Sequence, residues 1–366
     1  MKLIIIGNGF DLHCELKSSF IHFFEKKMKN EQGKYDPTKI RSNIWYLLFY
    51  FRFIKGTKDG VCKLVERDNV LWMDIESFIS HAVSDVNGVS IGRPMSTIQL
   101  IFRDKPKCTK NIDELNFVMY GNYSEQRDEI ISLINKNAKT NNAYTFLMDE
   151  LKRFENDFSQ YLLEEKSQNV FYKQRVNRSL IEITKKGSAF LIDFNYTNID
   201  EFEPVLFVHG SLEEGNVIIG ADASSLVQIN KNTLRFTKAW RKLSINSKSI
   251  KIPGKESVNE IVFYGHSLGQ QDYSYFHTIF NYYDIYSSNV VLTFLYSDYE
   301  YLDEKKTHPD FEKNERNRLK YIDNIFSLLR NYVEQTLNNV EANTVITKMQ
   351  LENRLRIMEF REYAYS

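Results

Sequence analysis

Short apolar runs alternate with helical periodicity along much of this chain. Leu3 to Ile6 is a continuous apolar run, which predicts a strand covered on both faces in a parallel sheet. The turn Gly7-Asn8-Gly9 follows at once, and apolar residues then recur at helical spacing. These are Leu12, Leu16, Phe20, Phe23 and Phe24. The N-terminus therefore predicts a strand, a tight turn and a helix in immediate succession.

The middle of the chain has a different pattern. Between residues 35 and 179 apolar residues recur at helical intervals, and convincing strands are scarce. Gly88 to Pro106 and Asn111 to Asn122 are expected to be loops or a flap. We interpret residues 35–179 as a largely helical insertion.

Strands are predicted again after residue 180, as short apolar runs bounded by Gly, Asn, Asp or Ser. They are Ala189 to Phe194, Val205 to Val208, Val217 to Ile219, Glu260 to Tyr264 and Val290 to Tyr296. An amphipathic helix is expected from Asn314 to Leu337. The last thirty or so residues have helical bias, and we expect them to pack against a partner chain, as in a homo-oligomer.

This order of elements predicts an α/β protein with a doubly wound, mainly parallel, Rossmann-like sheet that a helical insertion interrupts. The expected boundaries are 1–34 and 180–340 for the sheet domain, 35–179 for the insertion, and 341–366 for a C-terminal helical extension.

Composition narrows the classes of partner. Among 366 residues, Lys plus Arg equals Asp plus Glu at 48 each, so a bulk nucleic-acid binder is disfavoured. Cys14, Cys62 and Cys108 are scattered, which indicates reduced thiols and a cytoplasmic protein. The apolar run at the N-terminus is too short for a signal peptide, and no stretch is long enough to span a membrane. The histidines and cysteines form no ligand cluster, so no metal is implied.

Ligands of open α/β sheets bind beyond the carboxyl ends of the strands. Four predicted strand ends carry polar or glycine-rich sequence, and their convergence is the main functional signal. They are Gly7-Asn8-Gly9-Phe10-Asp11, Asn195-Tyr196-Thr197-Asn198, His209-Gly210-Ser211, and Gly265-His266-Ser267-Leu268-Gly269 with Asp272.

The first turn has two interpretations. Gly7 and Gly9 would let the backbone approach a phosphate at the start of a helix. Leu12 stands where the dinucleotide fingerprint has its third glycine, and no acidic strand end follows about twenty residues later, so an ordinary dehydrogenase is excluded. The alternative is a tight turn that Asp11 caps.

Asn195 and His209 also have two interpretations each. The amide of Asn195 could orient a ribose hydroxyl or a water, or it could form an Asx-turn or helix cap. His209 could act as a general base at a strand end, or it could be a buried structural histidine.

Gly265-His266-Ser267-Leu268-Gly269 matches the G-x-S-x-G nucleophile elbow and raises a serine hydrolase as a further alternative. Only His277 and His308 follow Ser267, and neither is well placed to serve as its base.

Asp74 and Glu76 offer two carboxylates, but an i, i+2 pair does not share a helix face. We therefore expect this segment to be a helix start with a solvated acid.

Several of these segments resemble the motifs of the AbiH family of bacterial phage defence. They are Leu3 to Leu12, Trp72 to Glu76, Phe194 to Asn198, Val208-His209-Gly210, and Gly265 to Asp272. The resemblance runs from residue 3 to about residue 300. That family resembles, more distantly, the sirtuin-like domains of phage-defence proteins, some of which hydrolyse NAD.

The resemblance implies a phage-defence protein that binds NAD or a related nucleotide in a sirtuin-like cleft and cleaves the glycosidic bond to nicotinamide. It assigns His209 and Asn195 to catalysis. It assigns phosphate binding to Gly7, Asn8, Gly9 and Asp11, and binding of the second ribose to Gly265 and Ser267. From their place in the same strand-end segments we also expect nucleotide binding by Phe10, Asn198, Gly210, His266 and Asp272. Thr197 stands where the sirtuin-like pattern has an aspartate, so binding carries over more safely than cleavage. The alternative is a non-catalytic sensor of a nucleotide or of a phage-derived trigger.

Overall fold

A computed structural model describes most of the chain outside residues 84–142. The described residues are 1–55, 63–64, 75–76, 79–80, 83, 143–197, 199, 202–223, 226, 229–245, 250–297, 311–337 and 342–365. The chain forms two compact units. The first comprises Met1–Ser18, Leu162–Val217 and Asn246–Ser366, and the second comprises Ser19–Tyr161 and Ile218–Ile245.

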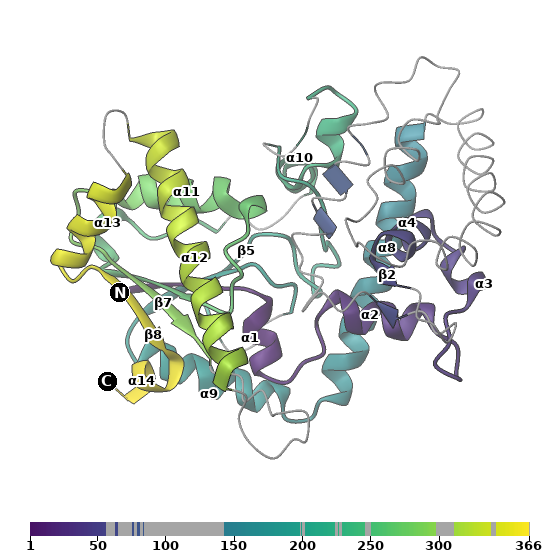
Figure 1. Cartoon of the computed structure of the whole chain (residues 1–366), viewed down its shortest axis with the longest axis horizontal. Helices are drawn as coiled ribbons and strands as arrows, with labels where there is room; N and C mark the ends of the chain where they lie inside the picture. The colour runs from purple at the N-terminus through teal and green to yellow at the C-terminus, as the bar shows by residue number, and fades with distance from the viewer. Residues whose placement is uncertain are drawn as a thin grey trace. The chain divides into compact units, whose positions relative to one another are not determined.

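A six-stranded sheet with parallel pairing throughout forms the centre of the first unit (Figure 1). Its strands are β1 (Lys2–Ile6), β4 (Ala189–Asp193), β5 (Val205–Phe207), β6 (Glu260–Tyr264), β7 (Val291–Tyr296) and β8 (Leu355–Glu359). The spatial order is β5-β4-β1-β6-β7-β8. Counted along the chain this is 3-2-1-4-5-6, the doubly wound Rossmann order, so the predicted fold class is confirmed.

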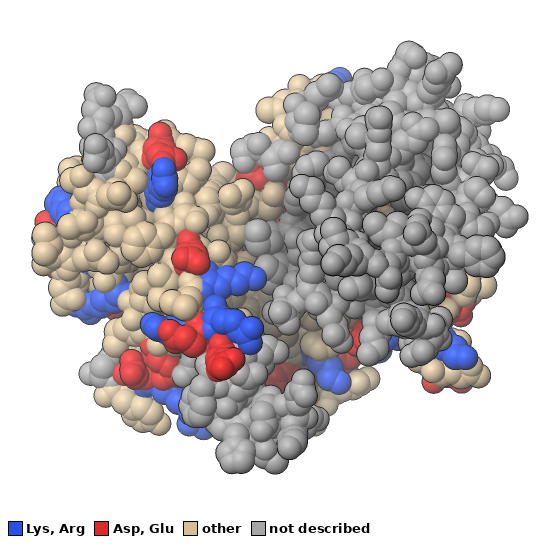
Figure 2. Space-filling view, viewed as in Figure 1, with Lys and Arg blue, Asp and Glu red and all other residues tan. Residues whose placement is uncertain are grey.

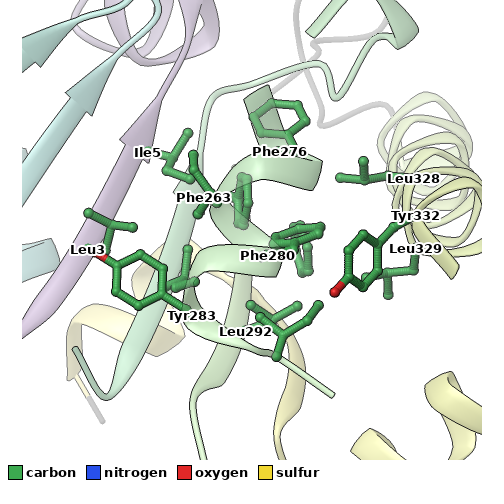
Figure 3. Close-up of a cluster of buried hydrophobic side chains, with 14 of the residues drawn as sticks. Leu3, Ile5, Phe263, Phe276, Phe280, Tyr283, Leu292, Leu328, Leu329 and Tyr332 are labelled. Carbon is green, nitrogen blue, oxygen red and sulfur yellow. The ribbon is translucent and has the colours of Figure 1, made fainter. Parts of the chain in front are cut away.

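Helices pack on both faces of this sheet. One face carries α11 (Tyr273–Tyr283), α12 (Phe311–Thr336) and α13 (Ala342–Leu351), and the other carries α1 (Asn8–His13), α9 (Tyr172–Thr184) and α14 (Phe360–Tyr365). Alternate residues of each strand point to opposite faces. Leu3 and Ile5 accordingly pack with Phe263 and Phe280 in one cluster (Figure 3), whereas Ile4 and Ile6 join the other.

The register places the three central strand ends at one level. Ile6, the last residue of β1, pairs with Asp193 of β4 on one side and with Tyr264 of β6 on the other. The loops that begin at residues 7, 194 and 265 therefore leave the sheet side by side. This alignment places the polar and glycine-rich segments that follow the three strands at one edge of the sheet.

Several details differ from the sequence-based expectations. Val217–Ile219 is not a strand, whereas Leu355–Glu359, expected to lie in a helical extension, is the sixth strand of the sheet. The first predicted helix is two helices, α1 and α2 (Phe20–Met28), because the chain turns at Glu15, which has a φ of 61°. The helix expected from Asn314 spans Phe311–Thr336. The expected loops within residues 88–122 lie outside the described residues.

The described part of the second unit is mainly helical. It contains α2, α3 (Pro37–Ile40), α4 (Ile44–Phe53), the larger part of α8 (Ala143–Gln168) and α10 (Lys238–Ser244). It also contains the short antiparallel strands β2 (Ile54–Lys55) and β3 (Lys63–Leu64). Phe20 and Phe23 of α2 lie 4.8 and 5.0 Å from Phe158 of α8, ring centroid to centroid. This aromatic packing explains why the unit begins at residue 19 rather than at the expected residue 35. Residues 218–245 also belong to it.

Among the described residues on the face in Figure 2, Lys and Arg side chains lie beside Asp and Glu side chains. These residues form no patch of a single charge sign on that face. None of the helices in the described part of the chain combines the length and the apolar character that crossing a membrane requires.

Candidate functional site

The candidate site lies in the first unit, at the carboxyl edge of the sheet. The strand order reverses between β1 and β6, and doubly wound folds bind their ligands at such a switch point. Gly7 follows β1 and Gly265 follows β6, so both glycine-rich turns begin here.

The two turns cross in direct backbone contact. The N–H of Gly9 donates to the carbonyl oxygen of Gly265 at 2.7 Å. A Cβ on Gly9 would lie 2.7 Å from that oxygen, and a Cβ on Gly7 would lie 2.7 Å from Cδ2 of His266. Gly265 has a φ of 68°, and its Cβ would lie 2.2 Å from the nitrogen of Phe10. The close approach of the two turns therefore requires glycine at these three positions.

The remaining residues of the first turn also have partners within the protein. Oδ1 of Asn8 accepts a hydrogen bond from Oγ of Ser18 at 2.5 Å, and Phe10 is buried with its ring against that of Tyr264. Helix α1 has Gly7 as its N-cap and no side-chain cap, so Asp11 is not the cap that one interpretation expected.

Asp11 is instead buried beneath the turn. Its two oxygens accept hydrogen bonds from the hydroxyls of Tyr172 and Thr197, both at 2.7 Å. Burial raises the pKa of Asp11 from 3.8 to about 6, although these two hydrogen bonds oppose the shift. This carboxyl therefore belongs to a buried polar group rather than to an open phosphate cradle.

Asp193 is the second buried acid at this edge, and sequence reasoning missed it. Its Oδ1 accepts the N–H of Asn195 at 2.7 Å, and its Oδ2 has no hydrogen-bond partner among the described residues. Burial, and then the charge of Asp11, raise the pKa of Asp193 well above 3.8. An acid that ends an otherwise apolar strand was the signal in the sequence that could have revealed it.

Asn195 joins two of the loops. Its Nδ2 donates to the carbonyl oxygen of Gly7 at 3.0 Å, and its side chain is buried. The bond holds the amide in one orientation. The Asx-turn at this point is formed by Asp193, not by Asn195 as one interpretation expected.

Two histidines share one carboxylate at the centre of the site. Nε2 of His209 lies 3.3 Å from Oδ1 of Asp272, and Nε2 of His266 lies 3.6 Å from Oδ2 of the same residue. The side chains of His209 and His266 are each 5% exposed, and that of Asp272 is 14% exposed. Gly210, beside His209, has a φ of 83° and turns the chain after β5.

Aromatic rings enclose both imidazoles. The ring of Phe194 lies edge to face against His209 at 5.4 Å and against His266 at 4.7 Å. Tyr275 packs on His209 at 5.6 Å, and Phe276 packs on His266 at 5.0 Å. These contacts fix the planes of the two rings.

The structure thus brings together most of the predicted site residues, from all four loops. Asn198 lies outside the described residues. No group of three or more His, Cys, Asp or Glu side chains within the described ranges is arranged to hold a metal ion. Cys14 is a free buried thiol, and burial raises its pKa to about 12.

Ser267 does not have the surroundings of a nucleophile elbow. That motif requires a strained strand-to-helix turn at the serine, whereas here the positive φ values belong to Gly265 and Leu268, and α11 begins only at Tyr273. His277, which follows on α11, lies against Tyr332 of α12 at 5.6 Å. The geometry therefore gives no support to a serine hydrolase.

The acidic segment near residue 76 belongs to the second unit. Glu76 is buried and pairs with Nζ of Lys238 at 2.6 Å, so the expectation of a solvated acid is wrong for this residue. Asp74 lies outside the described residues. Arg241 similarly forms a buried pair with Glu155.

A family model described as "Bacteriophage abortive infection AbiH" matches residues 3–296. No curated protein and no solved structure matches the chain, so the more distant sirtuin-like resemblance stays an expectation from the sequence. Because the family match spans most of the chain, from the first strand through β7, the protein belongs to the AbiH family of bacteriophage abortive infection.

Proposed function

We propose that this AbiH protein acts in phage defence by binding NAD or a close relative at the carboxyl edge of its sheet and cleaving the glycosidic bond to nicotinamide. The observation that carries the proposal is the pairing of His209 with Asp272 at 3.3 Å. An imidazole that a carboxylate holds at a strand end can accept a proton near neutral pH.

Cleavage of the glycosidic bond of NAD requires a general base but no general acid. The pyridinium nitrogen of NAD is already cationic, so nicotinamide leaves with the electron pair of the broken C–N bond and needs no proton. The oxygen of a water molecule forms the new bond to the ribose carbon, and the proton of that water goes to His209. Asn195, whose amide Gly7 holds in one orientation, is the group proposed to position the water.

The glycines have an indirect role in this scheme. Gly7, Gly9 and Gly265 let the loops meet, so they assemble the site rather than hold the diphosphate. Asn8 and Ser267 are half-buried at the same edge and are the side chains proposed to contact the phosphates and the second ribose.

A non-catalytic sensor is the second candidate, and the burial of the site favours it. His209 and Asn195 are each only 4% exposed, so the two proposed catalytic side chains are almost wholly enclosed. A sensor would bind the nucleotide without turning it over and would signal through a change in the surrounding loops.

One set of assays separates the candidates. Purified protein is incubated with NAD, NADP and cyclic ADP-ribose, release of nicotinamide and ADP-ribose is measured, and binding is followed by calorimetry. NAD content is also measured in phage-infected cells that express the protein, because infection supplies any trigger. The proposal expects turnover by the wild type that is lost in His209→Gln.

The matched control is His277→Gln. His277 is a similarly buried histidine on α11, against Tyr332 and outside the proposed machinery, so this variant should keep wild-type turnover. Binding without turnover in vitro and in infected cells would establish the sensor. Neither binding nor turnover would contradict both candidates.

A further inference from the structure

Asp272 is the last residue of a 3₁₀ turn (Gln270–Asp272) and directly precedes α11. Here its side chain makes no cap hydrogen bond. Its two oxygens face His209 and His266 instead, one oxygen to each imidazole.

We propose that Asp272 is the positioning residue of the site, and that it fixes His209 as the Nε2–H tautomer with Nδ1 as the proton-accepting nitrogen. The role in turnover rests on the proposed function, whereas the tautomer does not. An ionised carboxylate has only acceptors, so an imidazole nitrogen that bonds to it must carry hydrogen. Nε2 of His209 lies 3.3 Å from Oδ1 of Asp272, which puts the hydrogen of the neutral ring on Nε2.

His266 provides an independent anchor for this arrangement. Its Nδ1 accepts the backbone N–H of Leu268 at 2.9 Å, so Nδ1 carries no hydrogen. The neutral ring therefore carries its hydrogen on Nε2, which points to Oδ2 of Asp272 at 3.6 Å. The tautomer of His266 is set by the backbone and does not depend on the charge of Asp272.

Aromatic rings pack against both histidines. Phe194 contacts both imidazoles edge to face, with interplanar angles of 80° to His209 and 79° to His266. Tyr275 closes His209 on a second side at 79°, and it is the titratable side chain that α11 directs against this ring. Asp272, His266 and Tyr275 are thus the titratable groups that the described contacts place against His209.

The anchor makes the effect of Asp272→Asn predictable. The hydrogen of His266 stays on Nε2, because its Nδ1 accepts the N–H of Leu268. An amide NH₂ placed against this Nε2–H would set one donor against another, so the amide oxygen of the new asparagine faces His266. The amide NH₂ then faces Nε2 of His209, which becomes an acceptor, and the hydrogen of His209 moves to Nδ1. The substitution should therefore change the tautomer of His209 and leave that of His266 unchanged.

The test is ¹⁵N NMR of the full-length protein with labelled histidine, with assignments from His209→Gln and His266→Gln. The wild type should show both residues as Nε2–H tautomers. In Asp272→Asn, His209 should become Nδ1–H while His266 stays as it was. A wild-type His209 in the Nδ1–H form would overturn the inference, and so would an unchanged His209 in a folded Asp272→Asn. The wild-type spectrum decides the matter even where the variant fails to fold.

Turnover provides a second readout that separates this inference from the proposed function. If NAD is cleaved, Asp272→Asn should lower kcat by on the order of 10⁴-fold, as a wrong tautomer does in another histidine–carboxylate pair, with little change in KM. A higher KM with an unchanged kcat would contradict a positioning role. If no substrate is cleaved but the tautomers are as stated, the proposed function fails and the assignment of Asp272 holds.

Discussion

Gly9 and Gly265 meet backbone to backbone, with the N–H of Gly9 donating to the carbonyl oxygen of Gly265 at 2.7 Å. These residues lie more than 250 positions apart, and their contact ties the turn after β1 to the turn after β6. Each glycine is explained by the other, because a side chain on either would enter the backbone of its partner.

Gly265→Ala should therefore be strongly destabilising. The substitution would put a Cβ 2.2 Å from the nitrogen of Phe10 at a residue with a φ of 68°. We expect a loss of about 3 kcal/mol or more in the free energy of unfolding, measured by denaturant titration. Gly254→Ala is the control, since nothing lies within 4 Å of the position that a Cβ would take there, and it should change little. Equal stability of the two variants would contradict the close backbone contact between the turns that follow β1 and β6.

The buried acids predict a particular dependence of stability on pH. Both Asp11 and Asp193 hold a proton more tightly in the folded protein than in the unfolded chain, so the free energy of unfolding falls as pH rises. For Asp11 the loss runs from about pH 4 to about pH 6 and amounts to about 3 kcal/mol.

Asp193→Asn should remove the contribution of Asp193 to this loss. An asparagine keeps an acceptor for the N–H of Asn195 and needs no proton, so the variant should be more stable than the wild type at pH 8, with the difference shrinking toward pH 4. Asp36→Asn is the control, because hydrogen bonds from Thr38 lower the pKa of that acid and no gain at high pH is expected. A variant that is less stable than the wild type at pH 8 would refute the prediction.

The buried ion pair of the second unit joins Arg241 and Glu155. Removing one partner should lower the free energy of unfolding strongly, whereas replacing both partners should lower it less. Arg241→Met would leave the carboxylate of Glu155 buried without its cation, for an expected loss of about 3–5 kcal/mol. Adding Glu155→Gln removes that charge and keeps an acceptor for the N–H of Ile219, which lies 2.7 Å from Oε1 of Glu155. The double variant should recover part of the loss in a double-mutant cycle. Additive losses would show that the pair is not coupled.

Ser267 should not behave as an activated nucleophile. A fluorophosphonate probe is expected to leave the wild-type protein unlabelled, because the chain around Ser267 lacks the strained strand-to-helix turn of a nucleophile elbow. Labelling that disappears in Ser267→Ala, but not in Ser274→Ala on α11, would reverse this conclusion and restore the hydrolase.

The local patterns determined the fold class and the places where chemistry gathers. Apolar runs such as Leu3 to Ile6 and Glu260 to Tyr264 are strands, because a strand buried on both faces needs apolar side chains at nearly every position. The polar and glycine-rich segments at residues 7, 195, 209 and 265 do follow strands, and the parallel register brings them to one edge.

Only the tertiary structure decided what each residue of those segments contacts. Leu355–Glu359 is a strand because β7 offers a free edge, which no local pattern reveals. Asp11 is buried under Tyr172, Glu76 is paired with Lys238, and Asp272 bridges two histidines, since each partner is brought in by the packing of separate elements. Spacing along a sequence predicts which element a side chain belongs to, whereas its partners depend on how the elements pack.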